Sequence, residues 1–402
     1  PACRTGGIGA IVYPRVGGNV TYRAPKYQEP ENPVGTVAEL FAGIGGFRIG
    51  LARAGWKTVY SNQWEPSTKA QHASDVYVRQ FGPEGHSNED IFTVESLPVE
   101  VDMVVGGFPC QDYSVATTLR SSFGLEGRKG VLWWEMLRLI SQSRPKWVVL
   151  ENVDRMLKSP REQRGRDFAV MLASLADLGY SVEWRIINAA DYGMPQRRRR
   201  VYIMAYKNGT VVGEQMKASH VDEWLLAKGL MQNAFPTERE ALEKSIFTLE
   251  GTLADISENK KQFSEKTPFL DCGMMVNRTV TSFKTKPSFS GSAITLGDVL
   301  LDDDDIDYDY WISDNELDKW KYLKGAKRET RKTKDGFEYF YTEGPVAFPD
   351  AKDRPSRTII TGEGGRTPSR FKHVVETRPG RFRRLMPVEL ERLNMFPDHH
   401  TA

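Results

Sequence analysis

Short apolar runs alternate with segments of helical period from residue 36 to about residue 205. The runs predict strands, at 36–42, 58–61, 101–106, 147–150, 181–187 and 201–205. Apolar residues at helical spacing predict two helix faces: Ala70, Ala73, Tyr77 and Phe81, and then Phe168, Met171, Leu172, Leu175 and Leu178. This order predicts an α/β fold with a Rossmann-like, doubly wound sheet. The last two strands have no helical pattern between them, so we expect them to pair as a hairpin at the sheet edge.

The segments on either side of this domain, residues 36–206, have a different pattern. Residues 1–35 contain six Gly and five Pro and predict an irregular N-terminal arm. Residues 207–347 show no clean period and predict a second, smaller irregular domain, with a return segment at 348–402. The second domain has six Asp within 302–309 and eight Lys or Arg within 319–334. Each run, taken alone, is more typical of a solvated surface than of a binding site.

Composition excludes several classes of protein. The chain has 402 residues, 40% of them hydrophobic and 27% charged, which is typical of a globular protein. Because no apolar run reaches the roughly 18 residues of a membrane helix and no signal peptide opens the chain, we expect a soluble cytoplasmic protein. The net charge of +2 does not by itself indicate a nucleic-acid partner. Cys3, Cys110 and Cys272 are too few and too far apart for a disulfide framework, and we expect no metal site.

A glycine-rich turn follows the first expected strand. In Phe41-Ala42-Gly43-Ile44-Gly45-Gly46, the glycines would let a nucleotide-like ligand approach backbone N–H groups at the start of a helix. The third Gly of a dinucleotide fingerprint is replaced by Arg48, which weakens an NAD interpretation. A tight structural turn is an equally good interpretation of this segment alone.

Two further segments stand where parallel strands end. Gln63 and Trp64 follow the second strand, at the place of a ribose-binding side chain and of a ring that stacks on adenine, although Trp64 could also be plain core. Asp90 and Ile91 could supply an acceptor for an exocyclic amino group. Each of these signals is weak by itself.

The sharpest feature is Gly106-Gly107-Phe108-Pro109-Cys110-Gln111 after the strand at 101–106. Open α/β sheets bind ligands at the carboxyl ends of their strands, so the Cys110 thiol should lie beside the glycine-rich turn. A free cysteine is more often a small buried side chain. Here the flanking Gly and Pro favour a shaped turn and therefore a nucleophile.

Polar groups end two further strands. Glu151-Asn152-Val153 follows an apolar strand, where the carboxylate could act as a general acid or cap a helix. The run from Gln196 to Arg200 leads into the final strand. Because side chains alternate along a strand, Arg198 and Arg200 should share one face, and one arginine pair could face the site while the other meets phosphate.

In order and spacing, the segments that begin at Phe41, Gly107, Glu151 and Gln196 resemble the sequence blocks of the cytosine-C5 DNA methyltransferases. The resemblance covers about residues 36–205 and resumes at Arg357-Thr358-Ile359-Ile360-Thr361 and at 384–390. It implies an S-adenosylmethionine-dependent methyltransferase of a bacterium or phage, of the restriction-modification type. The substrate would be a cytosine flipped out of duplex DNA, and residues 207–347 would recognise the target sequence.

The resemblance also implies roles for single residues. Catalysis would fall to Cys110, Glu151, Arg198 and Arg200. The cofactor would be bound by Phe41, Gly43, Gly45, Gln63, Trp64, Asp90, Ile91, Pro109 and Leu132. DNA would be contacted by Gln111, Ser114, Asn152, Gln196 and Arg198, with phosphates also meeting Arg378, Arg381, Arg383 and Arg384, and residues 112–130 would close over the flipped base.

The chain departs from the family pattern at two places. Glu is usual where this chain has Gln63, so the amide, or neighbouring Glu65, would have to bind the ribose. The usual block after Pro397-Asp398 is absent, which leaves open a second chain as its source. The alternatives to DNA methylation are an RNA (tRNA) cytosine-C5 methyltransferase and a cofactor-binding DNA regulator without turnover. An NAD enzyme would leave Cys110, Glu151 and the arginines without a joint role.

Overall fold

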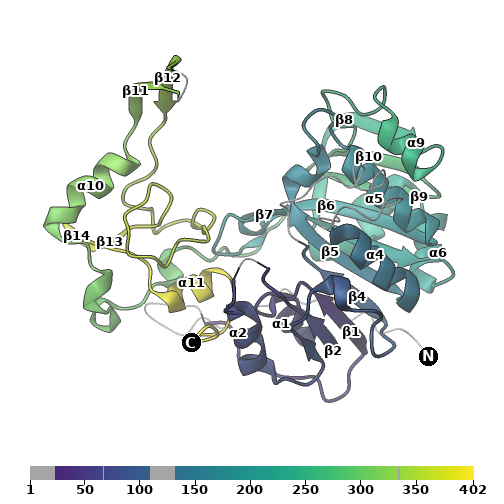
Figure 1. Ribbon diagram of the computed structural model, residues 1–402, viewed down its shortest axis with the longest axis horizontal. Coiled ribbons are helices and arrows are strands. Elements are labelled where there is room, and N and C mark those ends of the chain that lie inside the picture. Colours follow the sequence, from purple (N-terminus) through teal and green to yellow (C-terminus); the bar gives the residue numbers. More distant parts are fainter. Residues whose placement is uncertain (1–22, 67, 109–131, 334–335) are drawn as a thin grey trace. The chain divides into compact units, whose positions relative to one another are not determined.

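The computed structural model describes residues 23–66, 68–108, 132–333 and 336–402 (Figure 1). The described chain forms two compact units. The larger unit contains residues 27–188 and 199–290, and the smaller unit contains residues 23–26, 189–198 and 291–402. Pro109, Cys110, Gln111 and Ser114 lie outside the described residues, as does the segment 112–130 that we expect to close over the base.

The larger unit is built on one mixed sheet in the order β3-β2-β1-β4-β5-β7-β6-β9-β10-β8. The pairs from β3 to β5 are parallel, and those from β5 to β8 are antiparallel. The strands are β1 (Gly35–Leu40), β2 (Trp56–Asn62), β3 (His86–Ser87), β4 (Met103–Gly106), β5 (Trp147–Val153), β6 (Tyr180–Asn188), β7 (Arg199–Lys207), β8 (Thr237–Thr248), β9 (Cys272–Val276) and β10 (Thr279–Pro287). All six strands expected from the apolar runs are therefore present.

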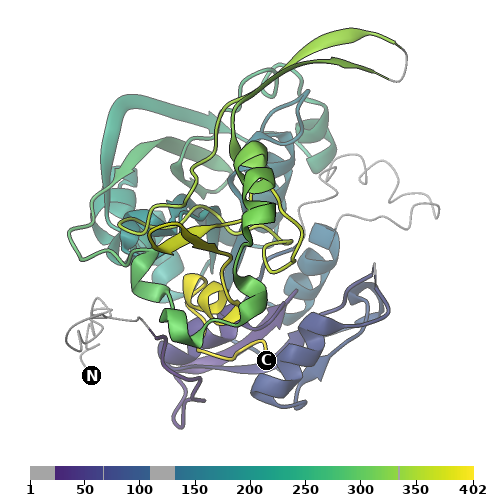
Figure 2. The same ribbon diagram turned by 90° about the vertical axis from the view of Figure 1, so that its left-hand side faces the viewer.

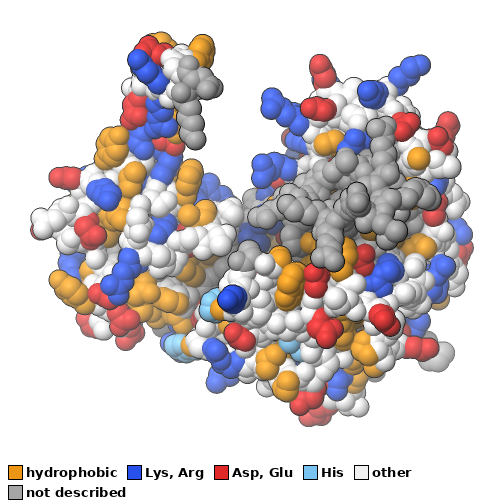
Figure 3. Space-filling view, viewed as in Figure 1, with side chains coloured by type: hydrophobic (Ala, Val, Ile, Leu, Met, Phe, Trp, Pro, Cys, Tyr) orange, Lys and Arg blue, Asp and Glu red, His pale blue; other side chains and the backbone are white. Residues whose placement is uncertain are grey.

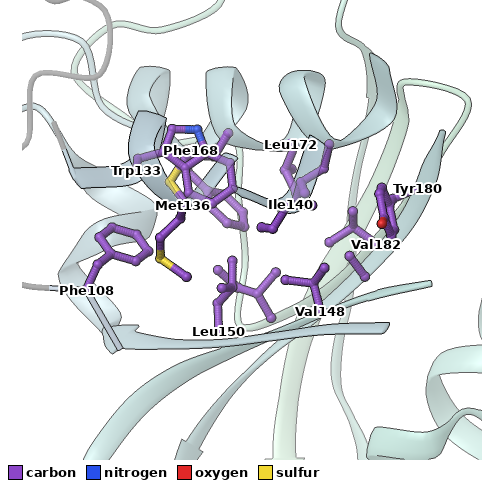
Figure 4. Close-up of a cluster of buried hydrophobic side chains, with 14 of the residues drawn as sticks. Phe108, Trp133, Met136, Ile140, Val148, Leu150, Phe168, Leu172, Tyr180 and Val182 are labelled. Carbon is purple, nitrogen blue, oxygen red and sulfur yellow. The ribbon is translucent and has the colours of Figure 1, made fainter. Parts of the chain in front are cut away.

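Helices cover both faces of this sheet, which confirms the doubly wound α/β fold. Val37 of β1 packs with Phe47 and Leu51 of α1 (Gly46–Arg53), whereas its neighbour Ala38 belongs to the core on the other face. That second core is formed with α4 (Leu132–Ser143) and α5 (Arg166–Asp177). Figure 4 shows the core side chains Trp133, Met136, Ile140, Phe168 and Leu172 above Val148 and Leu150 of β5. The opposite assignments of adjacent β1 residues follow from the two-residue period of a strand.

The remaining helices of the larger unit are short. Tyr77 is buried in α2 (His72–Phe81), on the helix face expected from the sequence. The segment between β7 and β8 forms α6 (Val211–Ala218), α7 (Val221–Glu223), a π-helical turn (Trp224–Lys228) and α8 (Leu230–Ala234), and α9 (Leu253–Glu258) precedes β9. No helix among the described residues is long and apolar enough to cross a membrane.

The position of β6 and β7 differs from the expectation. The two strands pair antiparallel, as expected, but they do not form the sheet edge, because β9 pairs with β6 and is followed by β10 and β8. The Trp184 ring lies flat against Gly273 of β9, where an added Cβ would come within 2.2 Å of Cζ2. Only glycine therefore permits this close approach of side chain and neighbouring strand.

The compact units also divide the chain elsewhere than the predicted boundary at residue 207. Residues 199–290 belong to the larger unit, because β8, β9 and β10 complete its sheet. The sequence analysis did not identify β8, β9 and β10, because these antiparallel strands lack the alternation of apolar runs with helical segments that identified the first six strands. Of the segment 207–347, only residues 291–347 lie in the smaller unit.

The smaller unit has its own core and little regular structure. It contains α10 (Asp314–Lys324), two hairpins and α11 (Pro387–Leu393). The hairpins are β11 (Lys327–Lys332) with β12 (Glu338–Glu343), and β13 (Val375–Arg378) with β14 (Arg381–Arg383). Leu296, Val299, Val375, Leu385 and Leu393 form the core.

Arg185 of β6 ties the segment after β7 to the sheet. Its guanidinium is fully buried and donates to the carbonyls of Leu225 at 2.7 Å and Phe235 at 2.6 Å, and to Gln232 Oε1 at 3.0 Å. We predict that Arg185→Met lowers the free energy of unfolding by about 3 kcal/mol, because these buried acceptors lose a charged donor. Chemical denaturation measures this change. The control Lys217→Met removes a lysine from a solvent-accessible ion pair with Glu214 and should cost less than about 0.5 kcal/mol; equal effects would contradict the prediction.

Candidate active site

The strand register brings the candidate segments to one edge of the sheet. Leu40 at the end of β1 pairs with Gly106 at the end of β4, and Gly106 pairs with Leu150 of β5. The glycine-rich turn and Gly107-Phe108 therefore leave the sheet beside Glu151 and Asn152, which follow Leu150 within β5. This edge is where open α/β sheets bind their ligands.

The glycine-rich turn closes tightly over the start of α1. Gly43 and Gly45 have φ angles of 56° and 87°, in the left-handed region that favours glycine. A Cβ at Gly45 would come within 2.2 Å of the Phe81 ring, so this position also lacks space for a side chain. Phe41 adopts a φ of 54° despite its bulk. The turn therefore brings the backbone close to the start of α1, where the Gly43 amide donates to Gln63 and the Gly45 amide donates to the Ala42 carbonyl.

The end of β2 contacts this turn directly. Gln63 Oε1 accepts a hydrogen bond of 2.8 Å from the Gly43 amide, so its side chain reaches the predicted cofactor cradle. Trp64 beside it is 38% exposed and is not a core residue. Glu65 Oε2 accepts from the Ala73 amide at 3.1 Å and stabilises the start of α2. That bond gives Glu65 a structural task in place of the ribose contact considered above.

Two further cofactor candidates lie at the ends of neighbouring elements. Asp90 caps a short 3-10 turn by accepting from the Phe92 amide at 3.2 Å, and Ile91 is buried. The Asn62 side chain donates to the Glu89 carbonyl at 2.9 Å and thereby holds this loop against the end of β2. Leu132 begins α4 and is half-buried.

Glu151 and Arg200 form an ion pair at the same sheet edge. Arg200 Nε lies 2.8 Å from Glu151 Oε1. The side chains of Arg200 and Glu151 are 19% and 23% exposed to solvent. The register explains the pair: Arg200 lies opposite Val153, two residues beyond Glu151 and so on the same face. Glu151 Oε2 also lies against Gly107, where a Cβ would be only 3.0 Å away. The carboxylate is thus held over the backbone three residues before Cys110.

Asn152 joins the two strand ends. It is buried, and its Nδ2 donates to the Phe108 carbonyl at 3.0 Å. The bond fixes the backbone that leads toward Pro109. Its role in the structure is therefore to position this segment, and a contact with DNA remains a prediction.

Comparison with known proteins identifies the family. The model of C-5 cytosine-specific DNA methylases matches residues 35–402. The chain is 45% identical over 373 residues to the type II methyltransferase M.Sau3AI of Staphylococcus aureus, covering 91% of this chain and 88% of that protein. The chain belongs to the C-5 cytosine-specific DNA methylases. It is a DNA cytosine methyltransferase, as the sequence blocks predicted.

More distant relatives agree with this assignment. The type II methyltransferase M.HhaI of Haemophilus parahaemolyticus is 35% identical over 173 residues, which is 42% of this chain and 48% of that protein. The crystal structure of the S. pombe Dnmt2 methyltransferase superimposes with a TM-score of 0.51 at 14% identity, over 91% of this chain and 87% of that chain. This structural likeness shows the fold.

Arg198 and Gln196 belong to the smaller unit of the methyltransferase, so the structure does not place them beside Glu151. Gln196 is buried, and its amide bonds to the Leu393 carbonyl at 3.2 Å, to Asn394 Oδ1 at 3.1 Å and to the Ile359 amide at 3.2 Å. These bonds join the segment 189–198 to the rest of the smaller unit. Arg199 has its own partners, Asp154 at 2.9 Å and Asp271 at 3.3 Å.

The expectation that four arginines near the C-terminus meet phosphate is wrong for two of them. Arg383 is fully buried and pairs with both Glu389 oxygens at 2.7 and 2.8 Å. Arg384 is 6% exposed and donates to the Asp309 carbonyl at 2.6 Å. Arginine frequency along the sequence did not distinguish these buried positions from surface ones. Arg378 pairs with Asp303 at 2.9 Å, and Arg381 stacks on Trp311.

Cys272 differs from the proposed nucleophile. It is fully buried in β9, and burial raises the pKa of its thiol to about 11. A neutral buried thiol is a poor nucleophile. Its position supports the assignment of the sequence's cysteine chemistry to Cys110.

A buried polar network beneath the glycine-rich turn was missed from the sequence. Glu39 of β1 is fully buried and accepts from the Tyr77 hydroxyl at 2.9 Å and from the Arg48 amide at 3.3 Å. The Arg48 guanidinium lies 4.7 Å from the Phe81 ring centroid and donates to the Tyr27 hydroxyl at 3.1 Å. The network fixes α1 and α2 against the strand that carries the turn. A charged residue inside an apolar run was the available signal.

Burial raises the pKa of Glu39 to about 7 from an ordinary value of 4.5, so folding favours its neutral form. The neutral Glu39 carboxyl therefore contributes its largest share to the free energy of unfolding below about pH 4.5, and this contribution is lost as the pH rises toward 7. Glu39→Gln cannot ionise. We predict that the free energy of unfolding of this variant, minus that of the unaltered protein, increases by about 2 kcal/mol when the pH is raised from 5.5 to 8. Urea unfolding of both proteins at the two pH values measures this. A difference between the proteins that does not change with pH would contradict it.

Proposed function

We propose that this methyltransferase transfers a methyl group from S-adenosylmethionine to C5 of a flipped-out cytosine in a specific duplex DNA sequence, through a covalent adduct of Cys110. The observation that carries the proposal is the Glu151 carboxylate, held by Arg200 at 2.8 Å over the backbone that leads to Cys110. The glycine-rich turn leaves the same sheet edge. Nucleophile, acid and cofactor cradle therefore follow from adjacent strands.

The residues at this edge fit S-adenosylmethionine, which supplies an electrophilic methyl group when it is bound. Gly43 and Gly45 form the turn of the proposed cradle, and the Phe81 ring fills the space beside Gly45, where a Cβ would come within 2.2 Å of it. Phe41, Gln63 and Trp64 flank that cradle, and Asp90, Ile91, Pro109 and Leu132 complete the proposed binding set. Backbone N–H groups at the start of α1 suit the polar groups of the ligand.

The proposed chemistry begins with cytosine, whose C5 is a poor nucleophile because its electrons belong to the aromatic ring. Addition of the Cys110 thiolate to C6 breaks the delocalisation and makes C5 able to attack the methyl group. Glu151 donates a proton or hydrogen bond to N3 as charge develops there. Arg200 and Arg198 orient the base and supply positive potential that favours the thiolate. Transfer of the methyl group would leave S-adenosylhomocysteine, and loss of the C5 proton to a base would then expel the Cys110 thiolate and release the product.

The proposed partner is double-stranded DNA. A base inside the stack is inaccessible, so the cytosine must be extruded at a cost of a few kcal/mol. Gln111, Ser114, Asn152, Gln196 and Arg198 are the proposed DNA contacts. A second chain as a partner is not supported by the relatives, and the proposal names duplex DNA alone. The likeness to a type II methyltransferase of Staphylococcus aureus supports a restriction-modification role in the bacterial cytoplasm, for a protein of a bacterium or of a phage.

Cys110→Ala should abolish both methyl transfer and the covalent complex with duplex DNA that contains 5-fluorocytosine, since fluorine at C5 blocks the release step.

Glu151→Gln should lower kcat by about 10²–10⁴-fold. Labelled cofactor, duplex DNA, tRNA and denaturing gels provide the measurements, and Cys272→Ala is the matched control that retains the adduct. Label in tRNA alone, or no adduct with the unaltered protein, would refute the proposal in favour of RNA methylation or a regulator without turnover.

Gln63→Glu should tighten the binding of S-adenosylhomocysteine, a stable cofactor analogue, about tenfold. A carboxylate keeps the acceptor used by the Gly43 amide and adds a second acceptor for a ribose hydroxyl, where the amide nitrogen can only donate. Calorimetric titration measures the affinity. The exposed control Gln215→Glu adds the same charge elsewhere on the larger unit; unchanged affinity at Gln63→Glu, or equal gains at both positions, would show that Gln63 does not contact the ribose.

A further inference from the structure

The β11–β12 hairpin has two faces with different surroundings. Directly paired residues share a face, so the register assigns each side chain to one of them. The inner face carries Lys327, Glu329, Arg331, Tyr339, Tyr341 and Glu343. The outer face carries Arg328, Thr330, Lys332, Glu338, Phe340 and Thr342, and all six of these residues are exposed. Figure 2 shows the hairpin extending away from α10.

Interactions within the smaller unit occupy the inner face. Arg331 lies 3.6 Å from the Tyr341 ring centroid and 3.2 Å from the Glu329 carboxylate. Glu343 pairs with Lys327 at 3.4 Å and with Arg370 at 2.9 Å. The Tyr322 hydroxyl of α10 donates to Glu329 at 3.1 Å. The inner face therefore anchors the hairpin and fixes its orientation on the smaller unit.

The outer face has no such partners among the described residues. Phe340 is 82% exposed at its centre, opposite Thr330. Arg328 makes no ion pair with a described residue, and Lys332 pairs at 2.8 Å only with Glu338, itself largely exposed. An exposed aromatic ring between two cations is typical of a surface that binds another molecule. Lys and Arg side chains gather along this hairpin in Figure 3.

Other arginines of the smaller unit are held by its own acidic groups. The ion pairs are Arg357 with Asp350, Arg378 with Asp303, Arg383 with Glu389 and Arg392 with Asp398. Arg328 thus offers a fork of donors that has no ion-pair partner among the described residues, on a hairpin whose inner face bonds to Arg370 and Tyr322. A planar guanidinium can bond a guanine edge in bidentate fashion, whereas a phosphate contact carries no sequence information.

We propose that the outer face of the β11–β12 hairpin enters the major groove of duplex DNA and reads bases of the recognition sequence, with Arg328 and Phe340 as its determinants. The inference rests on the proposed function, which makes DNA the substrate. The major groove, about 12 Å wide, admits a two-stranded ribbon, and its thymine methyl groups suit an apolar ring. A second copy of this chain fits less well, because the charged side chains of the outer face are Arg328, Lys332 and Glu338, so two copies would bring together faces with an excess of positive charge.

The test uses the full chain and five variants, three in the hairpin and two controls. Arg328→Ala removes the charge, Arg328→Lys keeps the charge without the fork, and Phe340→Ala removes the ring. Lys261→Ala and Ile246→Ala are controls at exposed positions of the larger unit. Repeated binding of a random duplex pool to the unaltered protein enriches the recognised sequence without requiring catalysis. Fluorescence anisotropy then compares the affinity for that duplex with the affinity for random DNA, and thermal melting verifies folding.

All three hairpin variants should lower the ratio of specific to random affinity by about tenfold or more, while both controls keep it. If the ratio of specific to random affinity does not change, the hairpin does not read bases; an equal loss of affinity for the enriched duplex and for random DNA leaves the ratio unchanged in this way. Failure of the unaltered protein to enrich any sequence would also overturn the inference. Altered sedimentation without altered DNA binding would assign the face to a second copy. Methyl transfer to DNA is measured separately. Sequence-specific binding without methyl transfer would refute the proposed function but not this inference. Methyl transfer together with an unchanged affinity ratio in the hairpin variants would refute this inference but not the proposed function.

Discussion

Backbone hydrogen bonding among β1, β4 and β5 is the constraint on which the candidate active site depends. Because these parallel strands are in register at Leu40, Gly106 and Leu150, the glycine-rich turn and Gly107 leave the sheet beside Glu151 of β5. Side chains then complete what the backbone begins: Asn152 holds the Phe108 carbonyl, and Gln63 holds the Gly43 amide. A shift of any one strand by one residue would turn its side chains to the other face. The Glu39 network under β1 opposes such a shift by fixing α1 and α2 to that strand.

Several buried charged side chains of this protein serve its structure. The formal net charge of +2 hides buried pairs such as Arg383 with Glu389 and a buried Arg185 that serves backbone carbonyls. Buried charges need such partners because removing them from water is costly. The cations that remain available for a polyanion are therefore identified by their lack of internal partners and not by their density along the chain. The proposed roles of Arg200 and Arg328 differ for this reason: one is held by a candidate acid at the sheet edge, and the other projects from a hairpin.

The extension of the sheet by β8, β9 and β10 changes where DNA recognition can be sought. These strands complete the larger unit, so only residues 291–347 of the segment predicted to recognise the target lie in the smaller unit, where the β11–β12 hairpin is one of the regular elements. The contact of Trp184 with Gly273 shows why the addition is stable, since a large ring packs where the neighbouring strand lacks a side chain.

The sequence by itself determined the α/β order, the first six strands and the family, because apolar periodicity and short blocks of glycine, cysteine and arginine are local properties of the chain. It also predicted Glu151 and Arg200 as site residues, although their roles stay predictions. Only the tertiary structure decided that these two side chains pair, that burial raises the pKa of Glu39, and that Arg383 and Arg384 are structural. It also decided that β6 lies inside the sheet and that Phe340 faces solvent. Each of these depends on contacts between distant segments, which bury a polar group or leave it exposed, and local composition does not carry that information.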